Sequence, residues 1–392
     1  MKIGIIGGGA SGLVAAITAK TKDNEVILFE RNKEVGKKIL ATGNGKCNYW
    51  NAEQYPINYE TSNKEQLTAI INSKTEEKVL SFFKELGILP KIKNGYYYPN
   101  SNQALTIRNA LEAEAKDKNI TIKNNYFVER ISKEKNQFVI NNEIRVDKLI
   151  IATGGYAAPK TGSTGMGYEF AKQFGHTIRK PLPSLVQLVT KKEWYLKEWK
   201  GIRTDVAVSQ IEVDSNRSIR TIRTELGEIQ LTDYGISGIC VFNLSNGIAR
   251  GLDEGKKESV EIDFLPSVEE SELRKILNTD KDIRRVLNGL LNEKLVNILL
   301  EFGTDKSELI ERMKHFQVQI IGTKGFDDAQ VTSGGVLLEE INLNTMESLK
   351  EKGLYLIGEL IDLTGDCGGY NLGICFRTAI IAGESIRGEK DA

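Results

Sequence analysis

Two short apolar runs at the start of the chain flank a glycine-rich turn and a segment with helical spacing. Residues 2–6 form an almost uninterrupted apolar stretch, as expected of a strand that is buried on both faces. Residues 13–20 repeat apolar positions at helical spacing, and residues 26–29 form a second buried strand that ends at Glu30. This order predicts the strand, helix and strand of a doubly wound α/β fold.

Short apolar runs and segments with helical spacing continue through the first half of the chain. Helical spacing, with glycine as a stop signal after the first segment, predicts helices at residues 75–86 and 104–116. Short apolar runs predict strands at residues 120–122, 126–128, 137–140 and 148–152.

The pattern changes in the middle of the chain and then returns. From about Leu182 to Pro266 short alternating segments predict antiparallel strands, whereas residues 267–314 have helical spacing and contain no proline. A strand at residues 354–359 and a closing helix from Leu372 to about Ile386 restore the α/β pattern.

We therefore expect one discontinuous domain with insertions, because a chain of 392 residues exceeds the usual size of a single core. The predicted fold class is α/β, with a Rossmann-like dinucleotide-binding domain at residues 1–188 and 320–392. A β-rich substrate lobe is expected at residues 189–266 and a small helical lobe at residues 267–319.

The turn after the first strand has the spacing G-x-G-x-x-G. Gly7 permits the tight turn, Gly9 lets a pyrophosphate approach the backbone, and Gly12 lets the helix pack on the strand. Ala10 and Ser11 then lie at the helix N-terminus, where N–H groups and the helix dipole favour an anion. Because a strand precedes this glycine turn, a helix follows it and an acid ends the next strand, the sequence predicts a site for NAD or FAD.

Charged residues follow the second strand. Glu30 is placed to accept hydrogen bonds from the two hydroxyls of a ribose, although an acid on a surface turn is the alternative. Arg31 adjoins it, and Lys37 and Lys38 are candidates to contact the adenosine or pyrophosphate side, with a solvated basic pair as the alternative.

Three further glycine-rich segments suggest a ligand longer than NAD. The loop at residues 42–48 is too polar and too rich in glycine for a helix interior; its candidate ligand-facing residues are Thr42, Gly43, Asn44, Gly45, Cys47 and Asn48. A second turn after a strand contains Thr153, Gly154 and Gly155, which we expect near the pyrophosphate or adenine. A third cluster opens the last helix with Gly368, Gly369, Tyr370, Asn371 and Leu372. FAD is therefore favoured over NAD.

The composition of the chain excludes some classes of partner but identifies none. Lysine plus arginine equals aspartate plus glutamate, 53 each, so no net charge favours nucleic acid or anionic lipid. Four cysteines without disulfide or metal spacing indicate a reducing compartment, and with two histidines no metal site is expected. The first apolar run belongs to the predicted strand rather than to a signal peptide, and no run is long enough to span a bilayer. We expect a cytoplasmic protein with a small-molecule substrate and neither nucleic-acid nor membrane partners.

The chain resembles the HI0933-like flavoproteins, also called YhiN-like or BaiN-like, which are related to aminoacetone oxidase. The stretches that carry the resemblance are residues 7–12, 36–38 with 42–48, 152–165, 358–372, 227–238 and 323–336. The resemblance implies FAD, a two-dinucleotide-binding flavoprotein fold and an inserted substrate lobe. It also implies that Glu359 contacts the ribityl hydroxyls, with Asp362 either sharing that role or capping the turn.

A bound FAD gives these segments specific expectations. The loop at residues 42–48 would contact the isoalloxazine ring, unless it is an ordinary loop. The final helix, entered through residues 368–372, would stabilise negative charge at flavin N1 and O2 through its dipole. Cys47 and Cys367 lie in two flavin-facing segments and form a redox pair if they meet, although buried cysteine more often fills apolar space.

The expected activity is hydride transfer through flavin N5, with no catalytic residue assigned. No second G-x-G-x-x-G follows a later strand, so NADH or NADPH would bind only transiently before an unsaturated small molecule is reduced. The first alternative is an amine oxidase that uses oxygen, and a flavoprotein that modifies RNA or binds a macromolecule is the second. Tyr96–Tyr98, Trp194 and Trp199 either face a substrate or pack inside the protein.

Overall fold

The computed structural model describes residues 1–213 and 219–388, which form two compact units. The first unit comprises Met1–Pro181 and Val331–Ala392, and the second comprises Leu182–Gln330. The expected α/β class with an inserted antiparallel lobe is confirmed. Among the described residues no helix is long and apolar enough to cross a bilayer.

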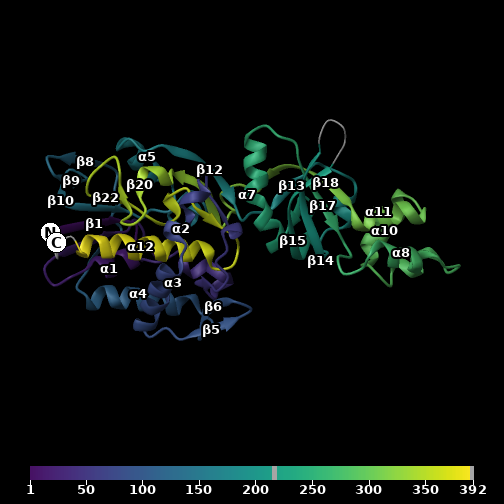
Figure 1. Ribbon diagram of the computed structural model, residues 1–392, viewed down its shortest axis with the longest axis horizontal. Coiled ribbons are helices and arrows are strands. Elements are labelled where there is room, and N and C mark those ends of the chain that lie inside the picture. The colour runs from purple at the N-terminus through teal and green to yellow at the C-terminus, as the bar shows by residue number, and fades with distance from the viewer. Residues whose placement is uncertain (214–218, 389–392) are drawn as a thin grey trace. The chain divides into compact units, whose positions relative to one another are not determined.

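A seven-stranded sheet forms the centre of the first unit (Figure 1). Its strand order is β20-β21-β22-β11-β1-β2-β7, with parallel pairing from β22 through β7 and an antiparallel edge at β20 and β21. The strands are β1 (Lys2–Ile6), β2 (Glu25–Phe29), β7 (Thr121–Lys123), β11 (Lys148–Ile151), β20 (Ile341–Asn342), β21 (Glu347–Ser348) and β22 (Leu354–Leu356). The central strands are buried almost throughout, which explains their continuous apolar runs.

Helices α1 (Ala10–Ala19) and α12 (Tyr370–Gly388) pack along each other in this unit, as Figure 1 shows for the yellow α12. Their contact requires a glycine, because a Cβ on Gly383 would lie 2.6 Å from the Thr18 Cβ. The other helices of the unit are α2 (Leu67–Ile70), α3 (Ser73–Glu85), α4 (Ala104–Asp117) and α5 (Met166–Gln173).

Small sheets complete the first unit. One has the order β10-β9-β8, a second β3-β6-β5, and two pairs join β12 to β19 and β23 to β4. Their bounds are β3 (Trp50–Asn51), β4 (Tyr59–Glu60), β5 (Pro90–Lys93), β6 (Tyr96–Pro99), β8 (Ile131–Glu134), β9 (Gln137–Ile140), β10 (Ile144–Val146), β12 (Ile178–Ser184), β19 (Val331–Val336) and β23 (Thr364–Gly365).

A closed barrel with the order β13-β16-β15-β14-β17-β18 forms the second unit together with helices. The strands are β13 (Leu188–Thr190), β14 (Arg203–Val213), β15 (Ile219–Leu231), β16 (Gly235–Ser237), β17 (Glu258–Asp263) and β18 (Phe316–Thr323). The helices are α6 (Tyr195–Glu198), α7 (Ile239–Asp253), α8 (Glu270–Leu277), α9 (Ile283–Leu287), α10 (Glu293–Phe302) and α11 (Lys306–Lys314). Barrel and helices share one apolar core.

The units change at residues 181/182 and 330/331, whereas the sequence places the boundaries at 188/189 and 319/320. The second boundary differs because β18 pairs with β13 and β17 and so belongs to the barrel. The helices expected as a separate lobe at residues 267–319 lie in the same compact unit as the barrel, since both contribute to its core.

Two local expectations are wrong. Residues 126–128 are irregular, and no strand in the described part of the chain pairs with them. The Tyr126 N–H donates to the Glu30 carbonyl beyond the end of β7. Helix α7 lies where only strands were expected. Its glycines lower helix propensity, but they make room for the barrel side chains Gln210 and Glu258, which would lie 2.8 and 1.7 Å from a Cβ at Gly247 and Gly251.

Candidate functional site

The turn between β1 and α1 is open on one side. Gly7 has a φ of 105°, whereas a Cβ on Gly9, the N-cap of α1, would meet no atom within 4 Å. Ser11 instead faces the C-terminal part of the unit, since a Cβ on Gly358 would lie 2.6 Å from its hydroxyl oxygen. Space in front of Gly9 and the start of α1, including Ala10, therefore suits an anion such as a pyrophosphate.

Glu30 is buried behind this turn, which excludes the alternative of an acid on a surface turn. Its Oε2 accepts a hydrogen bond from the Gly8 N–H at 2.8 Å, and its Oε1 accepts from the backbone N–H and the Nδ2 of Asn32, both at 2.7 Å. An ionised carboxylate has about four acceptor positions, so capacity for a ribose hydroxyl remains. Glu30 thus fixes the glycine turn through the Gly8 N–H.

Basic and amide side chains after β2 join this segment to the loop that follows β11. Arg31 Nη1 donates to Thr164 Oγ1 at 3.1 Å, and Lys37 Nζ donates to the Lys160 carbonyl at 2.7 Å. Asn32 Nδ2 donates to the Thr161 carbonyl at 3.0 Å. Arg31 and Lys37 are therefore not simply solvated, because they tie together two loops that are far apart in sequence.

Lys38 and Glu359, predicted from separate motifs, form an ion pair with a distance of 2.8 Å between Lys38 Nζ and Glu359 Oε2. Lys38 Nζ also donates to the Ala157 carbonyl at 3.4 Å. Glu359, in the 3₁₀ turn η6 (Gly358–Leu360), accepts from the Thr332 N–H through Oε1 at 3.1 Å. Three segments that are far apart in the sequence are joined at this point.

The loop at residues 42–48 has an unusual backbone. It contains the 3₁₀ segment η1 (Ile39–Gly45), but Thr42, Gly43 and Asn44 depart from helical geometry. Gly43, Asn44, Gly45 and Cys47 all have positive φ, at 55°, 54°, 80° and 56°. Left-handed backbone at a non-glycine residue costs on the order of 1–3 kcal/mol and clusters at functional sites. A Cβ on Gly45 would meet no atom within 4 Å, so this loop borders open space.

The end of this loop lies against the start of α12. A Cβ on Gly369, whose φ is 95°, would lie 2.7 Å from the Trp50 carbonyl oxygen and 2.9 Å from Asn48 Oδ1. Asn48 Oδ1 is buried and accepts no hydrogen bond from the described residues. An unsatisfied buried acceptor is costly, so this oxygen suits a donor on a ligand.

Other residues at the start of α12 have structural partners. Asn371 Oδ1 accepts from the Gly365 N–H at 2.9 Å, and its Nδ2 donates to the Gly365 carbonyl at 2.7 Å. The Tyr370 ring packs edge-on against Tyr59 with 5.5 Å between centroids. Gly368 has a φ of 119°, and Leu372 packs against the core.

The turn after β11 is confined from beneath. Gly154 has a φ of 71°, and a Cβ on Gly155 would lie 2.4 Å from Thr332 Oγ1 and 2.8 Å from the Tyr168 hydroxyl. Thr153 faces α5, because a Cβ on Gly167 would lie 2.0 Å from Thr153 Oγ1. The Tyr168 hydroxyl is buried and has no hydrogen-bond partner among the described residues, while desolvation by burial raises its pKa well above the usual value.

Asp362 is buried and its side chain contacts two other segments of the first unit. Its side chain is 1% exposed; Oδ2 accepts from the Ser62 N–H at 2.9 Å, and Oδ1 lies 3.3 Å from Arg179 Nη1. These partners hold the turn after η6 to two other segments of the first unit.

The residues present fit an FAD. Open space at Gly9 and Gly45, and the oxygens of Asn48 and Tyr168 that have no hydrogen-bond partner among the described residues, suit a polar ligand. Glu30 and the β1–α1 turn would hold the adenosine diphosphate half, and the loop at residues 42–48 with the entry to α12 would hold the isoalloxazine. The FAD supplies hydride transfer at N5.

The sequence did not identify Thr332, Tyr168 or Asn32 as part of this region. Thr332 lies within a stretch that resembles the family, residues 330–336, which was a usable signal. Tyr168 lies on an amphipathic helix, where an aromatic residue is ordinary, and Asn32 has no distinguishing motif.

The four cysteines are free thiols in this structure. None of the four, all of which lie in the described part of the chain, is in a disulfide. Burial raises the pKa of the Cys47 thiol to about 11, although a hydrogen bond with Thr42 opposes the shift. Cys47 therefore remains a protonated thiol near neutral pH. The described residues contain no group of three or more metal-ligating side chains.

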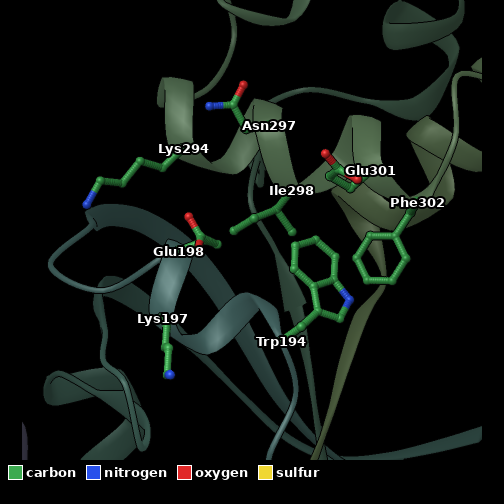
Figure 2. Close-up of a pocket in the computed structure, with 8 residues that line it drawn as sticks. All are labelled: Trp194, Lys197, Glu198, Lys294, Asn297, Ile298, Glu301 and Phe302. Carbon is green, nitrogen blue, oxygen red and sulfur yellow. The ribbon is translucent and has the colours of Figure 1, made fainter.

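The second unit has a separate hollow of about 590 Å³ beside α6 and α10 (Figure 2). Trp194 and Phe302 line it with 5.4 Å between ring centroids, and lysine and glutamate side chains surround them. Trp199, in contrast, is fully buried and donates from Nε1 to the Thr232 carbonyl at 2.8 Å. Trp199 is a packing residue, whereas Trp194 borders this hollow.

Solved structures support the flavoprotein fold. The 3-ketosteroid delta1-dehydrogenase of Sterolibacterium denitrificans superposes with a TM-score of 0.54 over 99% of both chains at 10% identity. A flavocytochrome c3 fumarate reductase superposes with a TM-score of 0.51 at 16% identity, covering 98% of this chain and 78% of the other. At these identities the likeness concerns the fold alone.

Two relatives found by sequence have considerably higher identity to this chain than the solved structures have. The 3-dehydro-bile acid delta(4,6)-reductase of Clostridium scindens is 39% identical over 98% of each chain. A ribosomal RNA dihydrouridine synthase of Haemophilus influenzae is 32% identical over 97% of each chain. The model of the HI0933-like protein Rossmann domain matches residues 1–385. The chain therefore belongs to the HI0933-like family, and it is an FAD-dependent oxidoreductase.

Proposed function

We propose that the protein reduces a carbon–carbon double bond of a small organic substrate, with NADH or NADPH as hydride donor and FAD as the carrier. The observation that carries the proposal is the joining of glycine-rich segments in the first unit. The segment that follows β2 meets both the turn after β11 and η6 at Lys38, while the loop at residues 42–48 meets the entry to α12 at Asn48. This arrangement suits a long dinucleotide with its ring end near α12.

The names of the relatives favour reduction over oxidation. The bile acid relative is named a reductase. Dihydrouridine is uridine with the C5=C6 bond saturated, so the name of the second relative also describes the saturation of a carbon–carbon double bond. A shared reaction type on different substrates is consistent with one flavin chemistry and a variable substrate-binding region.

The chain's own residues orient the cofactor and stabilise charge. The N-terminus of α12 offers a positive dipole end, which favours negative charge on a reduced ring. Asn48 Oδ1 offers a buried acceptor at the same end of the unit. The residues assigned to FAD contact are those of the four glycine-rich segments, at residues 7–12, 42–48, 153–155 and 368–372, together with Glu30 and Glu359.

A second candidate substrate is RNA. Relatives from Haemophilus influenzae and Escherichia coli, 32% and 30% identical, are both named ribosomal RNA dihydrouridine synthases. Against this candidate, the chain carries 53 basic and 53 acidic residues, and tight phosphate binding depends on an excess of lysine and arginine. The small-molecule substrate is therefore the proposal.

The test is anaerobic flavin reduction followed by reoxidation. The purified yellow protein is mixed without oxygen with NADH, NADPH or aminoacetone, and flavin absorbance is followed. We expect a nicotinamide to bleach the flavin and an enone, such as a 3-keto-4-ene steroid, to restore the colour. Bleaching only by aminoacetone would favour an amine oxidase, and reoxidation only by a uridine-containing RNA would favour the second candidate.

A further inference from the structure

Thr332 holds the turn after β11 with a single hydroxyl group. Its Oγ1 accepts hydrogen bonds from the N–H groups of Tyr156 and Ala157, at 2.8 and 3.0 Å. The Thr332 side chain is buried, with 1% of the residue exposed. Two backbone donors therefore depend on one acceptor that water does not readily replace.

Glu359 and Lys38 extend this contact to two other segments. Glu359 accepts from the Thr332 N–H at 3.1 Å and pairs with Lys38 Nζ at 2.8 Å, while Lys38 Nζ reaches the Ala157 carbonyl at 3.4 Å. The turn at residues 155–157 thus donates two backbone N–H groups to Thr332, and its Ala157 carbonyl accepts from Lys38.

The same turn is confined by packing. Gly155 has no room for a Cβ, because Thr332 Oγ1 and the Tyr168 hydroxyl would lie 2.4 and 2.8 Å away. The turn therefore packs closely against β19 and α5 at Gly155. Contacts with Thr332, Glu359 and Lys38, which we call the bracket, hold the turn on one side. Tyr168 packs against it on another side.

A partly buried ion pair stabilises a loop inefficiently, because the desolvation of both charges opposes their attraction. Side-chain exposure is 28% at Lys38 and 14% at Glu359, so both ions lose hydration, and apolar contacts would often stabilise a fold as well. A polar bracket instead fixes the direction of backbone groups, which matters where backbone meets a ligand.

We propose that Thr332, Glu359 and Lys38 form a positioning bracket that sets the turn at residues 155–157 for FAD and thereby controls how slowly FAD dissociates. Thr332 is a positioning residue that acts through the Tyr156 and Ala157 backbone. The inference rests on FAD as the ligand and holds for any substrate that the flavin reduces.

The first test compares Thr332→Val with Thr332→Ser. Valine removes the acceptor at nearly constant volume, so we expect FAD dissociation to accelerate on the order of tenfold; serine keeps the hydroxyl and should restore slow dissociation. Thr190→Val is the matched control, because Thr190 is also buried and its hydroxyl has no partner among the described residues. FAD release is measured by flavin fluorescence, well below the melting temperature of each apoprotein.

The second test uses Lys38→Met. The Lys38 side chain is partly exposed, so this variant should remain folded. FAD should again dissociate faster, and Lys38→Met combined with Thr332→Val should cost less than the sum of the single changes. Wild-type release rates in folded Lys38→Met and Thr332→Val would overturn the inference; if the valine variant does not fold, Lys38→Met alone decides. Failure of the wild-type protein to bind FAD would instead refute the cofactor assignment.

Discussion

The Gly7 carbonyl oxygen and Gly12 approach so closely that a Cβ on Gly12 would lie 1.8 Å from that oxygen. Gly12 is therefore required by the protein itself, because α1 packs directly on the turn that begins at Gly7. Gly9 differs, since a Cβ there meets no protein atom within 4 Å and its φ is −81°. The glycines of one motif thus differ, because the fold requires Gly12 but leaves the space in front of Gly9 open.

Gly9→Ala and Gly12→Ala should consequently fail in different ways. Gly9→Ala should keep the melting temperature of the apoprotein but bind FAD about tenfold or more weakly, because its methyl group enters the space used by the pyrophosphate. Gly12→Ala should lose stability before any ligand is added. Calorimetry of the apoproteins and fluorescence titration with FAD distinguish the two; full FAD affinity in Gly9→Ala would move the ligand away from this turn.

Glu30→Ala should weaken FAD binding by about 1.5–3 kcal/mol for each hydrogen bond lost to the carboxylate. The loss has two sources, because Glu30 also accepts from the Gly8 N–H and so fixes the glycine turn. Apoprotein should accumulate during purification. Glu25→Ala, at the exposed start of the same strand, is the control and should keep its flavin. Equal FAD affinity in both variants would remove Glu30 from the site.

The sequence predicted the parts of the site that carry local signals. Glycine spacing, a buried strand and a following acid place Gly9 and Glu30 without knowledge of the fold, because these residues act within one βαβ unit. Glu359 and Asp362 were predicted from the family resemblance, but their partners were not. The Lys38–Glu359 pair spans 321 residues, and nothing local to either residue indicates the other.

Tertiary context explains the remaining differences. Thr332 lies in a stretch that carries the family resemblance, but its hydrogen bonds to the turn at residues 155–157 arise from tertiary packing, which the sequence does not show. Helix α7 was missed because Gly247 and Gly251 lower its propensity, while the side chains that require those glycines come from the barrel strands β14 and β17. The pairing of β18 with β13 similarly moves the domain boundary.

Cys47 should react very slowly with iodoacetamide at pH 8. Its pKa of about 11 leaves a thiolate fraction on the order of 10⁻³, and its side chain is buried as well. Cys367, which is partly exposed, should be alkylated first. Mass spectrometry of peptides after timed alkylation measures both. Rapid labelling of Cys47 in the folded holoprotein would restore the redox-pair hypothesis.

The chain's two histidines should titrate in opposite directions from the ordinary value. Burial lowers the pKa of His176, and its contact with Glu340 does not fully offset this effect. Burial also acts on His315, but hydrogen bonds with Glu261 and Glu270 outweigh it and raise the pKa of that imidazole.

The signs of the two contributions to stability follow from these directions. A raised folded-state pKa means that His315 stabilises the fold below its unfolded pKa of about 6.5 and loses that contribution as the pH rises through the folded value. His176 does the reverse, because the unfolded chain binds the proton more readily, so its contribution is lost as the pH falls through 6.5 toward the lower folded value. NMR titration of the imidazole signals measures both, with His315→Gln providing the assignment. Two pKa values within error of 6.5 would show that neither the burial of His176 nor the hydrogen bonds of His315 persist in solution.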